Sequence, residues 1–577
     1  MSAAGFIGRV GGLAVALGVG AAAFSGTVAW ADNADSSSHA GSARSSSGDT
    51  SSVAGPAKRG AATAAKARTR PTTSVRAQSI TSVAPAAATP AAAADPSTSD
   101  TPVVPSEPSL ELAALAYSRR DTGVSARAAA ATSLAPEGSV QALAAQNTAV
   151  IMGPSGVPIP DLSYIQDVFN LYINPSYPGS IPFQLDTPEG LYPITGVKSL
   201  PLNVSVQQGI QILTVAIAEQ ILAGNTSTVF GYSQSAIISS LIMSQLPADT
   251  PVNFVLVGNE MNPNGGFLSR FPGLKLPSLG LDFYGATPEN LFPTTNYTLE
   301  YDGFADFPRY PLNLVSVLNA GLGIIFVHTK YADLTQQQVD NAIALPTTDP
   351  TQKYYIIPTE NLPLLEPLRL IPVIGTPLAD LLQPALKVIV NLGYGDPQYG
   401  WSNEGFANQQ TTFGFIPDVN WGQVANLFFA GVEQGIQDFI ADVSPGGVMW
   451  QELAALKLPK PGSITPPPTP ASIITALQTA TTDTALFISN AAASIYAAAL
   501  PTADIVNAIV VMLPAYSVTL FLDGIEQALS GDVITGLVNA IGLPLAASAG
   551  LATTATLIEF LVLLQAVQGV LGKQTDV

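Results

Sequence analysis

The period of the hydrophobic pattern changes sharply near the middle of the chain. Residues 226–230 form a short run of β-branched and aromatic residues, which predicts a buried strand. Beyond Gln234 the apolar residues recur at the spacing of one helix face, at Ile237, Ile238, Leu241, Ile242 and Leu246. A strand is therefore expected to turn directly into a helix, with Ser233 at the corner.

This turn carries Gly-Tyr-Ser-Gln-Ser at residues 231–235, close to the G-x-S-x-G pattern of a nucleophile elbow. Small residues two positions before and after the serine let strand and helix approach closely, and Ser235 replaces the second glycine. In such an elbow the hydroxyl is exposed, and the next backbone N–H, that of Gln234, can face an oxyanion. A serine that caps the N-terminus of a helix gives the same string, so both interpretations stay open here.

Strands and helices alternate on either side of the turn. Further strands are expected over 148–152, 254–257 and 297–301, and an apolar stripe over 206–221 predicts a helix. That helix is expected to begin at a capping box of Ser205 and Gln208, and to end at Gly224. The alternation predicts an α/β fold, an α/β-hydrolase with a central, mostly parallel sheet.

The loop after the first strand, Gly-Pro-Ser-Gly at residues 153–156, is a second candidate element. In α/β-hydrolases the loop after an early strand donates the second N–H of the oxyanion hole, and Ser155 is the candidate donor here. An ordinary turn between a strand and a loop accounts for these four residues equally well.

The amino-acid composition excludes several kinds of functional site. The 577 residues include no Cys and two His, which excludes disulfides, thiol chemistry, Cys-based zinc sites and multi-histidine metal sites. We therefore expect neither a cofactor nor a metal. The net charge of −19 makes the chain a poor binder of nucleic acid.

A serine nucleophile needs a base that takes its proton and a carboxylate that orients the base. His39 lies in a low-complexity region, so His328 is the available imidazole. Asp302 and Asp306 lie between it and Ser233, in the Ser, Asp, His order of α/β-hydrolases. Asp306 stands in a Gly-x-x-Asp-x-Pro context and is the preferred acid. Asp302 is the alternative acid, or else the cap of its own turn.

The first 147 residues are expected to precede the folded body. Residues 1–31 combine Arg9, an apolar run and Ala-Trp-Ala, as in a secretory signal peptide, with an uncleaved anchor as the alternative. Residues 32–147, rich in Ala, Ser, Thr and Pro, are expected to form a disordered linker because they bury too little apolar surface to offset ordering. A secreted or envelope-associated protein is thus expected.

The hydrolase body is expected to span residues 148–396. Residues 397–458 are interpreted as a lid or a bridging segment, and residues 459–470 as a Pro-rich linker. Residues 471–577 are Ala- and Leu-rich with few charges, which predicts a helical accessory region; membrane spans are the alternative.

Four blocks of sequence point to one family. They are Thr-Pro-Glu-Gly-Leu-Tyr-Pro-Ile-Thr-Gly at 187–196, Gly-Tyr-Ser-Gln-Ser at 231–235, Gly-Asn-Glu-Met-Asn-Pro-Asn-Gly-Gly at 258–266 and Tyr-Asp-Gly-Phe-Ala-Asp-Phe-Pro at 301–308. Residues 354–368 and 392–394 agree with them. Through these blocks the chain resembles the PE-PPE domain, a mycobacterial serine α/β-hydrolase family related to cutinases, over residues 149–396.

The resemblance implies esterase, lipase or acyltransferase activity on acyl esters, often lipids of the cell envelope. It gives Ser233 the role of nucleophile and His328 that of base. The expected partner is an acyl ester or lipid substrate, with peripheral association with a membrane or the envelope. A signal and a linker stand where a PE or PPE helical module is usual, so no partner tied to those modules is expected. A non-catalytic envelope binding or scaffold protein that keeps the hydrolase fold is the competing hypothesis.

Overall fold

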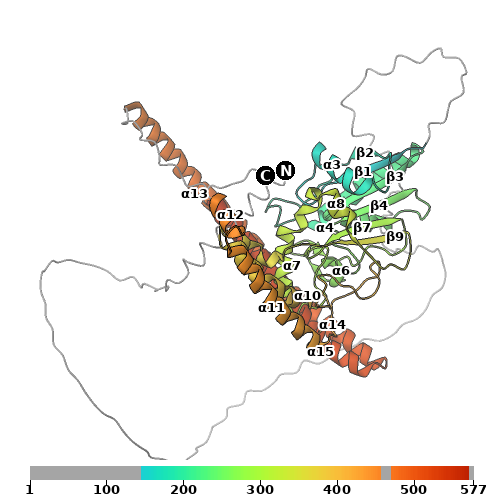
Figure 1. Cartoon of the computed structure of the whole chain (residues 1–577). Coiled ribbons are helices and arrows are strands. Elements are labelled where there is room, and N and C mark those ends of the chain that lie inside the picture. Colours follow the sequence, from blue (N-terminus) through green and yellow to red (C-terminus); the bar gives the residue numbers. More distant parts are fainter. Residues whose placement is uncertain (1–144, 456–469, 571–577) are drawn as a thin grey trace, which may run out of the picture. The chain divides into compact units, whose positions relative to one another are not determined.

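The computed structural model describes residues 145–455 and 470–570 (Figure 1). The predicted signal peptide, nearly all of the predicted linker over 32–147, and residues 459–469 of the predicted Pro-rich linker lie outside the described residues. His39 lies outside them as well.

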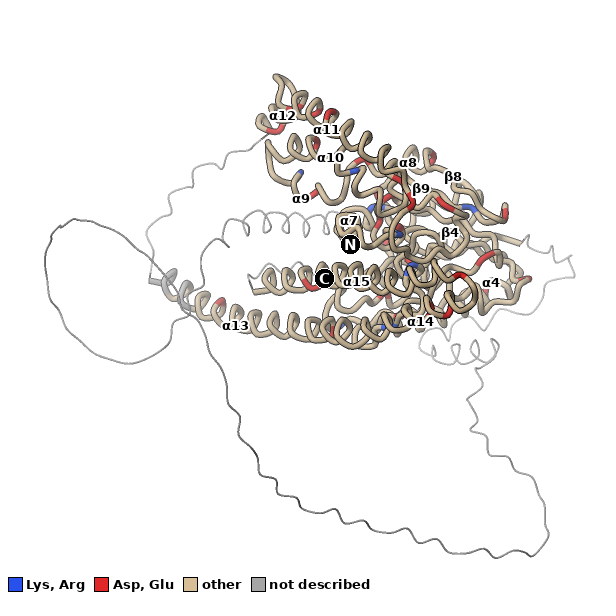
Figure 2. The backbone as a smooth tube through the Cα atoms, turned by 90° about the horizontal axis from the view of Figure 1, so that it is seen from below, with Lys and Arg blue, Asp and Glu red and all other residues tan. Residues whose placement is uncertain are grey.

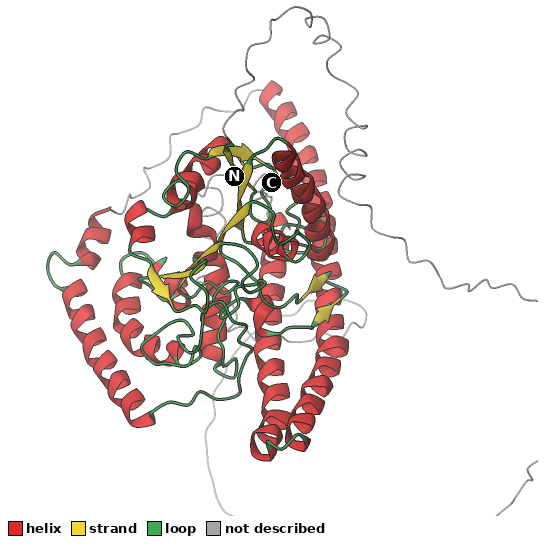
Figure 3. Cartoon of the chain, turned by 90° about the vertical axis from the view of Figure 1, so that its right-hand side faces the viewer, coloured by secondary structure: helices red, strands yellow, loops and turns green. Residues whose placement is uncertain are grey.

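A seven-stranded sheet forms the centre of the fold (Figures 1 and 3). Its strand order is β2-β1-β3-β4-β7-β9-β8. All neighbouring pairs are parallel except β8 and β9, which pair antiparallel at one edge. This confirms the expected α/β fold with a mostly parallel sheet. The strands are β1 (Asn147–Ile151), β2 (Ile181–Gln184), β3 (Thr226–Tyr232), β4 (Val252–Val257), β7 (Thr294–Leu299), β8 (Ile343–Leu345) and β9 (Gln352–Ile357).

The expected strands correspond to β1, β3, β4 and β7, with slightly different ends. β2, β8 and β9 were not expected. β2 is only four residues long, Ile-Pro-Phe-Gln, and contains a proline, which argues against a strand when only the sequence is considered; all four of its residues are exposed. A small separate sheet pairs β5 (Lys275–Leu276) with β6 (Leu281–Asp282).

Helices connect the strands and cover the sheet. Up to the end of the predicted body they are α3 (Leu162–Val168), η1 (Phe169–Ile173), α4 (Leu202–Leu222), α5 (Gln234–Met243), α6 (Phe267–Arg270), α7 (Leu314–Phe326), η2 (His328–Asp333), α8 (Gln336–Asp340), η3 (Pro363–Leu365), α9 (Glu366–Arg369) and α10 (Gly375–Asn391). Beyond it come α11 (Trp421–Val443), α12 (Val448–Ala455), α13 (Pro470–Asn507), η4 (Ala508–Met512), α14 (Leu513–Leu529) and α15 (Val533–Val570).

The sheet is buried on both faces. In β1, Val150 faces the core that α4 and α5 cover, whereas Ala149 and Ile151 face the core that α3 and η1 cover. All three side chains are fully buried. A strand covered on both faces is apolar at every position instead of alternating, which explains the uninterrupted apolar run of this segment.

The helix before the elbow begins earlier than expected. α4 begins at Leu202 with Pro201 at its N-cap, so Ser205 lies inside the helix. The Ser205 hydroxyl accepts a hydrogen bond from the Gly190 N–H at 2.8 Å. The expected capping box of Ser205 and Gln208 is therefore wrong. Ser205 instead fixes the loop over 187–190 against the body.

The segment predicted as a lid or bridge contributes a helix that packs against the body. α11 lies along α10, and Gly435 permits the close approach, because a Cβ there would lie 2.0 Å from the Leu381 carbonyl oxygen. Of the aromatic residues in the segment, Phe413 is buried, whereas Trp421 and Phe429 are exposed. The segment thus has one face in the core, and its role as a lid stays a prediction.

The C-terminal region is helical, as expected, and contacts the body. Asp504 of α13 accepts a hydrogen bond from the Tyr192 hydroxyl at 2.6 Å, and its carbonyl accepts one from Ser278 Oγ at 2.8 Å. Leu513 and Leu520 of α14 belong to the core that α4 and α5 cover. These helices are therefore packed on the α/β body along part of their length.

Two stretches of this region, Gln478–Leu529 and Val533–Val570, have the length and composition of membrane-spanning helices. Their mean hydropathies are 2.1 and 1.7, respectively. Within the most apolar part of each stretch, only 17% of the first and 28% of the second is buried. Residues 470–570 contain no Lys or Arg, and Figure 2 shows only scattered acidic positions along α13, α14 and α15. Much apolar surface of these helices remains exposed.

Candidate active site

Ser233 lies at the turn between β3 and α5, in the conformation of a nucleophile elbow. Its φ of 57° and ψ of −122° are strained for a residue with a side chain. A Cβ on Gly231 would lie 2.6 Å from the Ser235 carbonyl oxygen and 2.8 Å from Ala236 Cα, so only glycine fits there. Ser233 stands at the N-cap position of α5, but its side chain makes no capping hydrogen bond, so it does not act as a capping serine.

Ser235 shows why a serine can replace the second glycine of the pattern. Its side chain is buried, and its hydroxyl accepts a hydrogen bond from the Tyr232 N–H at 2.8 Å. The hydroxyl therefore stabilises the last residue of β3 immediately before the strained serine. A glycine at this position would lack that contact.

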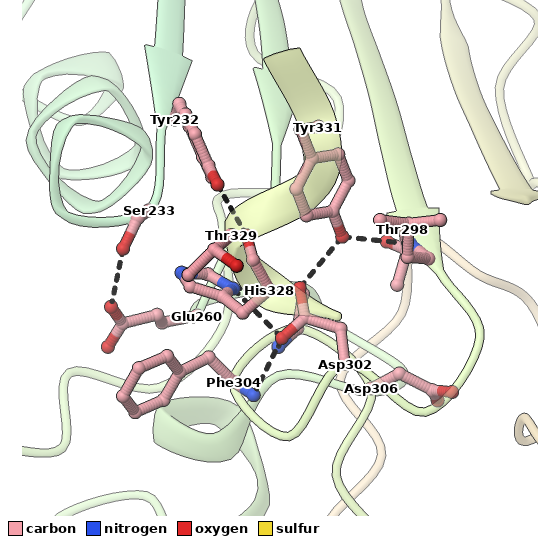
Figure 4. Close-up of polar contacts among 12 residues, drawn as sticks. Tyr232, Ser233, Glu260, Thr298, Asp302, Phe304, Asp306, His328, Thr329 and Tyr331 are labelled. Atoms are coloured by element: carbon pink, nitrogen blue, oxygen red, sulfur yellow. Dashed lines mark hydrogen bonds and ion pairs between the residues drawn. The ribbon is translucent and has the colours of Figure 1, made fainter. Parts of the chain in front are cut away.

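His328 and Asp302 form a buried pair close to Ser233 (Figure 4). His328 is the first residue of η2, and Asp302 lies in the loop that follows β7. His328 Nδ1 lies 2.9 Å from Asp302 Oδ1 and 2.8 Å from Oδ2. This contact leaves Nε2 as the nitrogen available for a proton.

Asp302 is held by three further donors. The Tyr331 hydroxyl donates to Oδ2 at 2.8 Å, and the backbone N–H groups of Phe304 and Ala305 donate to Oδ1 at 2.9 and 3.3 Å. Tyr331 is itself fixed, because its oxygen accepts the Leu299 N–H at 2.8 Å. Burial, followed by the charge of Asp302, raises the pKa of Tyr331 well above its usual range, so this hydroxyl stays a donor.

Asp306 does not contact His328, so the expectation that it orients the imidazole is wrong. Its carboxylate accepts the Tyr301 N–H at 3.0 Å. Tyr301 has a φ of 66°, and the turn after it closes through a 2.6 Å hydrogen bond from the Asp306 N–H to the Asp302 carbonyl. Because of this turn, the carboxylate of Asp302 contacts His328, whereas that of Asp306 contacts the backbone of Tyr301. Burial raises the pKa of Asp306 well above its usual range, against the Tyr301 hydrogen bond and the charge of Arg270.

The Ser233 hydroxyl donates to Oε1 of Glu260 at 3.3 Å (Figure 4). His328 Nε2 is buried and has no hydrogen-bond partner among the described residues. Ser233 and His328 therefore share one site without a direct hydrogen bond in this structure. Hydrogen bonds between a nucleophile and its base are often long or absent before substrate binds.

The candidate site combines one imidazole with buried carboxyl groups. Burial lowers the pKa of His328, but the charge and hydrogen bond of Asp302 and the charge of Glu260 outweigh it, so the pKa is raised. Burial also raises the pKa of Glu260 to about 7 and that of Glu189 to about 8. Glu189 lies in the loop fixed by Ser205, and one of its oxygens, Oε2, is buried without a partner in the described structure.

The two predicted oxyanion elements lie next to one another. Gln234 is the first residue of α5, so its backbone N–H has no partner within the helix. Its side-chain Nε2 donates to Ser155 Oγ at 3.3 Å, across the gap between the elbow and the 153–156 loop. Gly153 is required in that loop because a Cβ there would lie 2.1 Å from the Val157 carbonyl oxygen.

Sequence reasoning missed Glu260 and Glu189 as parts of the site. Both lie in blocks that carry the family resemblance, at 258–266 and 187–196, and Glu260 follows the end of β4 by three residues. Within residues 145–455 and 470–570, no group of three or more His, Asp or Glu side chains is arranged to hold a metal ion.

Comparison with known proteins agrees with the motifs. Residues 178–395 match the model of the PE-PPE domain. The uncharacterised PPE family protein PPE28 of Mycobacterium tuberculosis is 51% identical over 74% of this chain and 66% of its own length. Esterase PE16 of the same organism is 46% identical over 44% of this chain and 49% of its own length. Diacyltrehalose acyltransferase Chp2, also from M. tuberculosis, is 26% identical over 30% of this chain and 51% of its own length.

The match to these relatives is partial, since the chain spans between about half and two thirds of the length of each. The region that carries Ser233, Glu260, Asp302 and His328 lies inside the matched domain. The chain therefore carries a PE-PPE domain at residues 178–395, and its relatives are mycobacterial PE and PPE proteins.

Proposed function

We propose that this protein is a serine hydrolase of the esterase or lipase type, with Ser233 as nucleophile, His328 as base and Asp302 as the orienting carboxylate. The observation that carries the proposal is the buried Asp302–His328 pair next to a serine in a strained strand-to-helix turn. A strained backbone conformation persists only where the surrounding structure enforces it, and such conformations cluster at active sites. The named relatives support the same reaction class, since one is an esterase and one an acyltransferase.

The first half-reaction forms an acyl-enzyme. Ser233 Oγ bonds to the carbonyl carbon of the ester while its proton passes to His328 Nε2. The carbonyl electrons move onto the oxygen, which the backbone N–H groups of Gln234 and Ser155 would stabilise. The intermediate then expels the alcohol, which takes the proton from Nε2.

The second half-reaction releases the acyl group. An acceptor O–H gives its proton to His328 Nε2 and its oxygen attacks the acyl carbon, after which Ser233 leaves and takes the proton back. Water as acceptor makes the protein an esterase, and a sugar hydroxyl makes it an acyltransferase. In both cases Asp302 keeps Nδ1 protonated and stabilises the imidazolium.

We also propose that the C-terminal helices bring the enzyme to lipid. α13 exposes large apolar side chains along its middle, among them Phe487, Ile488, Ile495 and Tyr496. An exposed apolar surface of this extent marks an interaction site, and acyl esters of long chains gather in membranes and lipid aggregates. Export to the envelope, the other part of the expected localisation, rests on residues 1–31, outside the described structure.

A panel of acyl esters of increasing chain length tests the proposed function. The full-length protein is assayed with each ester, in water alone and with a sugar as acceptor, next to Ser233→Ala. We expect turnover by the wild type that Ser233→Ala abolishes, with free acid or acyl sugar identifying the acceptor. A folded wild type that turns over no ester would favour the competing hypothesis of a binding or scaffold protein.

A further inference from the structure

The Ser233 hydroxyl has a buried partner that the reaction scheme above does not use. Ser233 Oγ donates to Glu260 Oε1 at 3.3 Å, and the two residues are each 2% exposed. His328 Nε2, the atom that has to receive the proton, is buried and unpartnered within the described residues. In this structure the hydroxyl is therefore oriented by Glu260.

The backbone around Glu260 is fixed, so the position of its carboxylate is a feature of the fold. Glu260 lies in the loop after β4, and its carbonyl accepts the Leu268 N–H at 3.0 Å. A Cβ on Gly266 would lie 2.3 Å from that carbonyl oxygen, so the loop closes around the residue. On the other side, Asn259 Oδ1 accepts the Met261 N–H at 3.0 Å.

The groups that face Glu260 are themselves titratable. Its surroundings include His328 of η2, Asp302 of the loop after β7 and Glu189 of the 187–190 loop. Around His328 and Asp302 lie two tyrosine hydroxyls: Tyr232 donates to the His328 carbonyl, and Tyr331 donates to Asp302. Of the groups just named, His328 is the one that forms a cation.

Charge links Glu260 to His328 although the two side chains share no hydrogen bond. Burial lowers the pKa of His328, and the negative charge of Glu260 adds to that of Asp302 in raising it. In turn, burial raises the pKa of Glu260 to about 7, while the charge of His328 and the hydrogen bond from Ser233 act against it. Each group favours the charged form of the other.

We propose that Glu260 is a second carboxylate of the serine site, which holds the Ser233 hydroxyl before reaction and then stabilises the imidazolium of His328. This inference rests on the proposed function. During attack the hydroxyl turns from Glu260 to His328 Nε2, the proton moves to Nε2, and Oγ bonds to the acyl carbon; Glu260 takes no proton. The imidazolium that forms is then stabilised by Asp302 at Nδ1 and by the charge of Glu260. Glu260 is a positioning residue in this scheme.

The pH profile of kcat/KM tests this role, measured on the full-length protein with a short, soluble p-nitrophenyl ester. The variants are Glu260→Gln, which removes the charge at nearly constant shape, and Glu260→Asp, which keeps it. Glu300→Gln is the matched control, because Glu300 is also a buried carboxylate but binds the backbone of Thr359 and Gly400 away from Ser233. Thermal unfolding shows which variants fold, and Glu260→Ala replaces Glu260→Gln if the latter does not.

In Glu260→Gln we expect the acid limb of the profile to move to lower pH, because His328 loses a charge that raises its pKa. We also expect kcat to fall about tenfold, because the imidazolium loses part of its stabilisation. Glu260→Asp and Glu300→Gln should keep the wild-type limb. An acid limb that stays in place in the neutral Glu260 variant overturns the inference, whatever happens to kcat. If the wild type itself turns over no ester, the proposed function fails and this inference falls with it.

Discussion

Replacing Glu189 with Gln should stabilise the protein at alkaline pH and flatten the pH dependence of its stability. Glu189 is 1% exposed; Thr187 Oγ1 donates to Oε1 at 2.7 Å, and Oε2 has no partner in the described structure. Burial raises its pKa from the ordinary 4.5 to about 8, with the Thr187 hydrogen bond acting against burial. An amide of the same shape keeps the Thr187 contact and never has to be buried as an ion.

The sign follows from the raised pKa. Between pH 4.5 and about 8 the folded protein keeps a proton on Glu189 that the unfolded chain releases. The stabilisation is therefore complete below pH 4.5 and is lost as the pH rises through 8. The difference between the two pKa values corresponds to a loss of unfolding free energy of roughly 5 kcal/mol at most. Local relaxation around the buried ion makes the actual loss smaller. Glu260, whose pKa burial raises to about 7, acts in the same direction.

Urea unfolding of the full-length protein at pH 5 and pH 8.5 measures this effect. The wild type should lose on the order of 2–5 kcal/mol between these pH values, and Glu189→Gln should lose clearly less. Glu219→Gln is the control, because Glu219 is exposed on α4 and should follow the wild type. Parallel pH dependences for wild type and Glu189→Gln would refute the reasoning, as would wild-type stability that rises with pH over this range.

Four further variants test other parts of the structure. Asp302→Asn should lower the turnover of esters by about 10⁴-fold because the imidazole loses its orienting carboxylate. Asp306→Asn should stay within about tenfold of wild type and mainly affect stability. If ester hydrolysis shows the reverse order, the acid role returns to Asp306. Gly231→Ala should destabilise the fold by about 1–3 kcal/mol, since the added Cβ meets backbone atoms of Ser235 and Ala236, and an unchanged urea midpoint would contradict this. A chain that ends at Lys457 should aggregate, because it exposes the core surface that Leu513 and Leu520 cover; a soluble, sharply melting product would show that the tail is dispensable for folding.

The central part of the fold could be predicted from sequence because its elements carry strong local patterns. β3 and α5 meet at Ser233 with an abrupt change of period, and the last three residues of β1 are buried and apolar. β2 is too short for a reliable pattern and contains a proline, and it is defined by its hydrogen bonds to β1. The start of α4 was misplaced because Ser205 binds Gly190, a contact 15 residues away that no local cap rule includes.

The site shows a similar division. Ser233 could be chosen because the expected strand-to-helix turn carries the elbow pattern, and His328 because it is the one imidazole outside the low-complexity region. The choice between Asp302 and Asp306 depends on the left-handed conformation of Tyr301, which is unusual for a residue with a side chain and leaves no mark in the sequence. Glu260 is recognisable only once β3 and β4 lie side by side, because its contact with Ser233 is made between two loops.

Labelling of the full-length protein with a fluorophosphonate tests the central claim most directly. The probe reacts with a serine that an adjacent base activates, so it reports the proposed state of Ser233 without any assumption about the ester substrate. The account predicts that the wild type is labelled, that peptide mapping places the label on Ser233, and that labelling is lost in Ser233→Ala and strongly slowed in Asp302→Asn. A folded wild type that is not labelled, or a label on another serine that persists in Ser233→Ala, would contradict it.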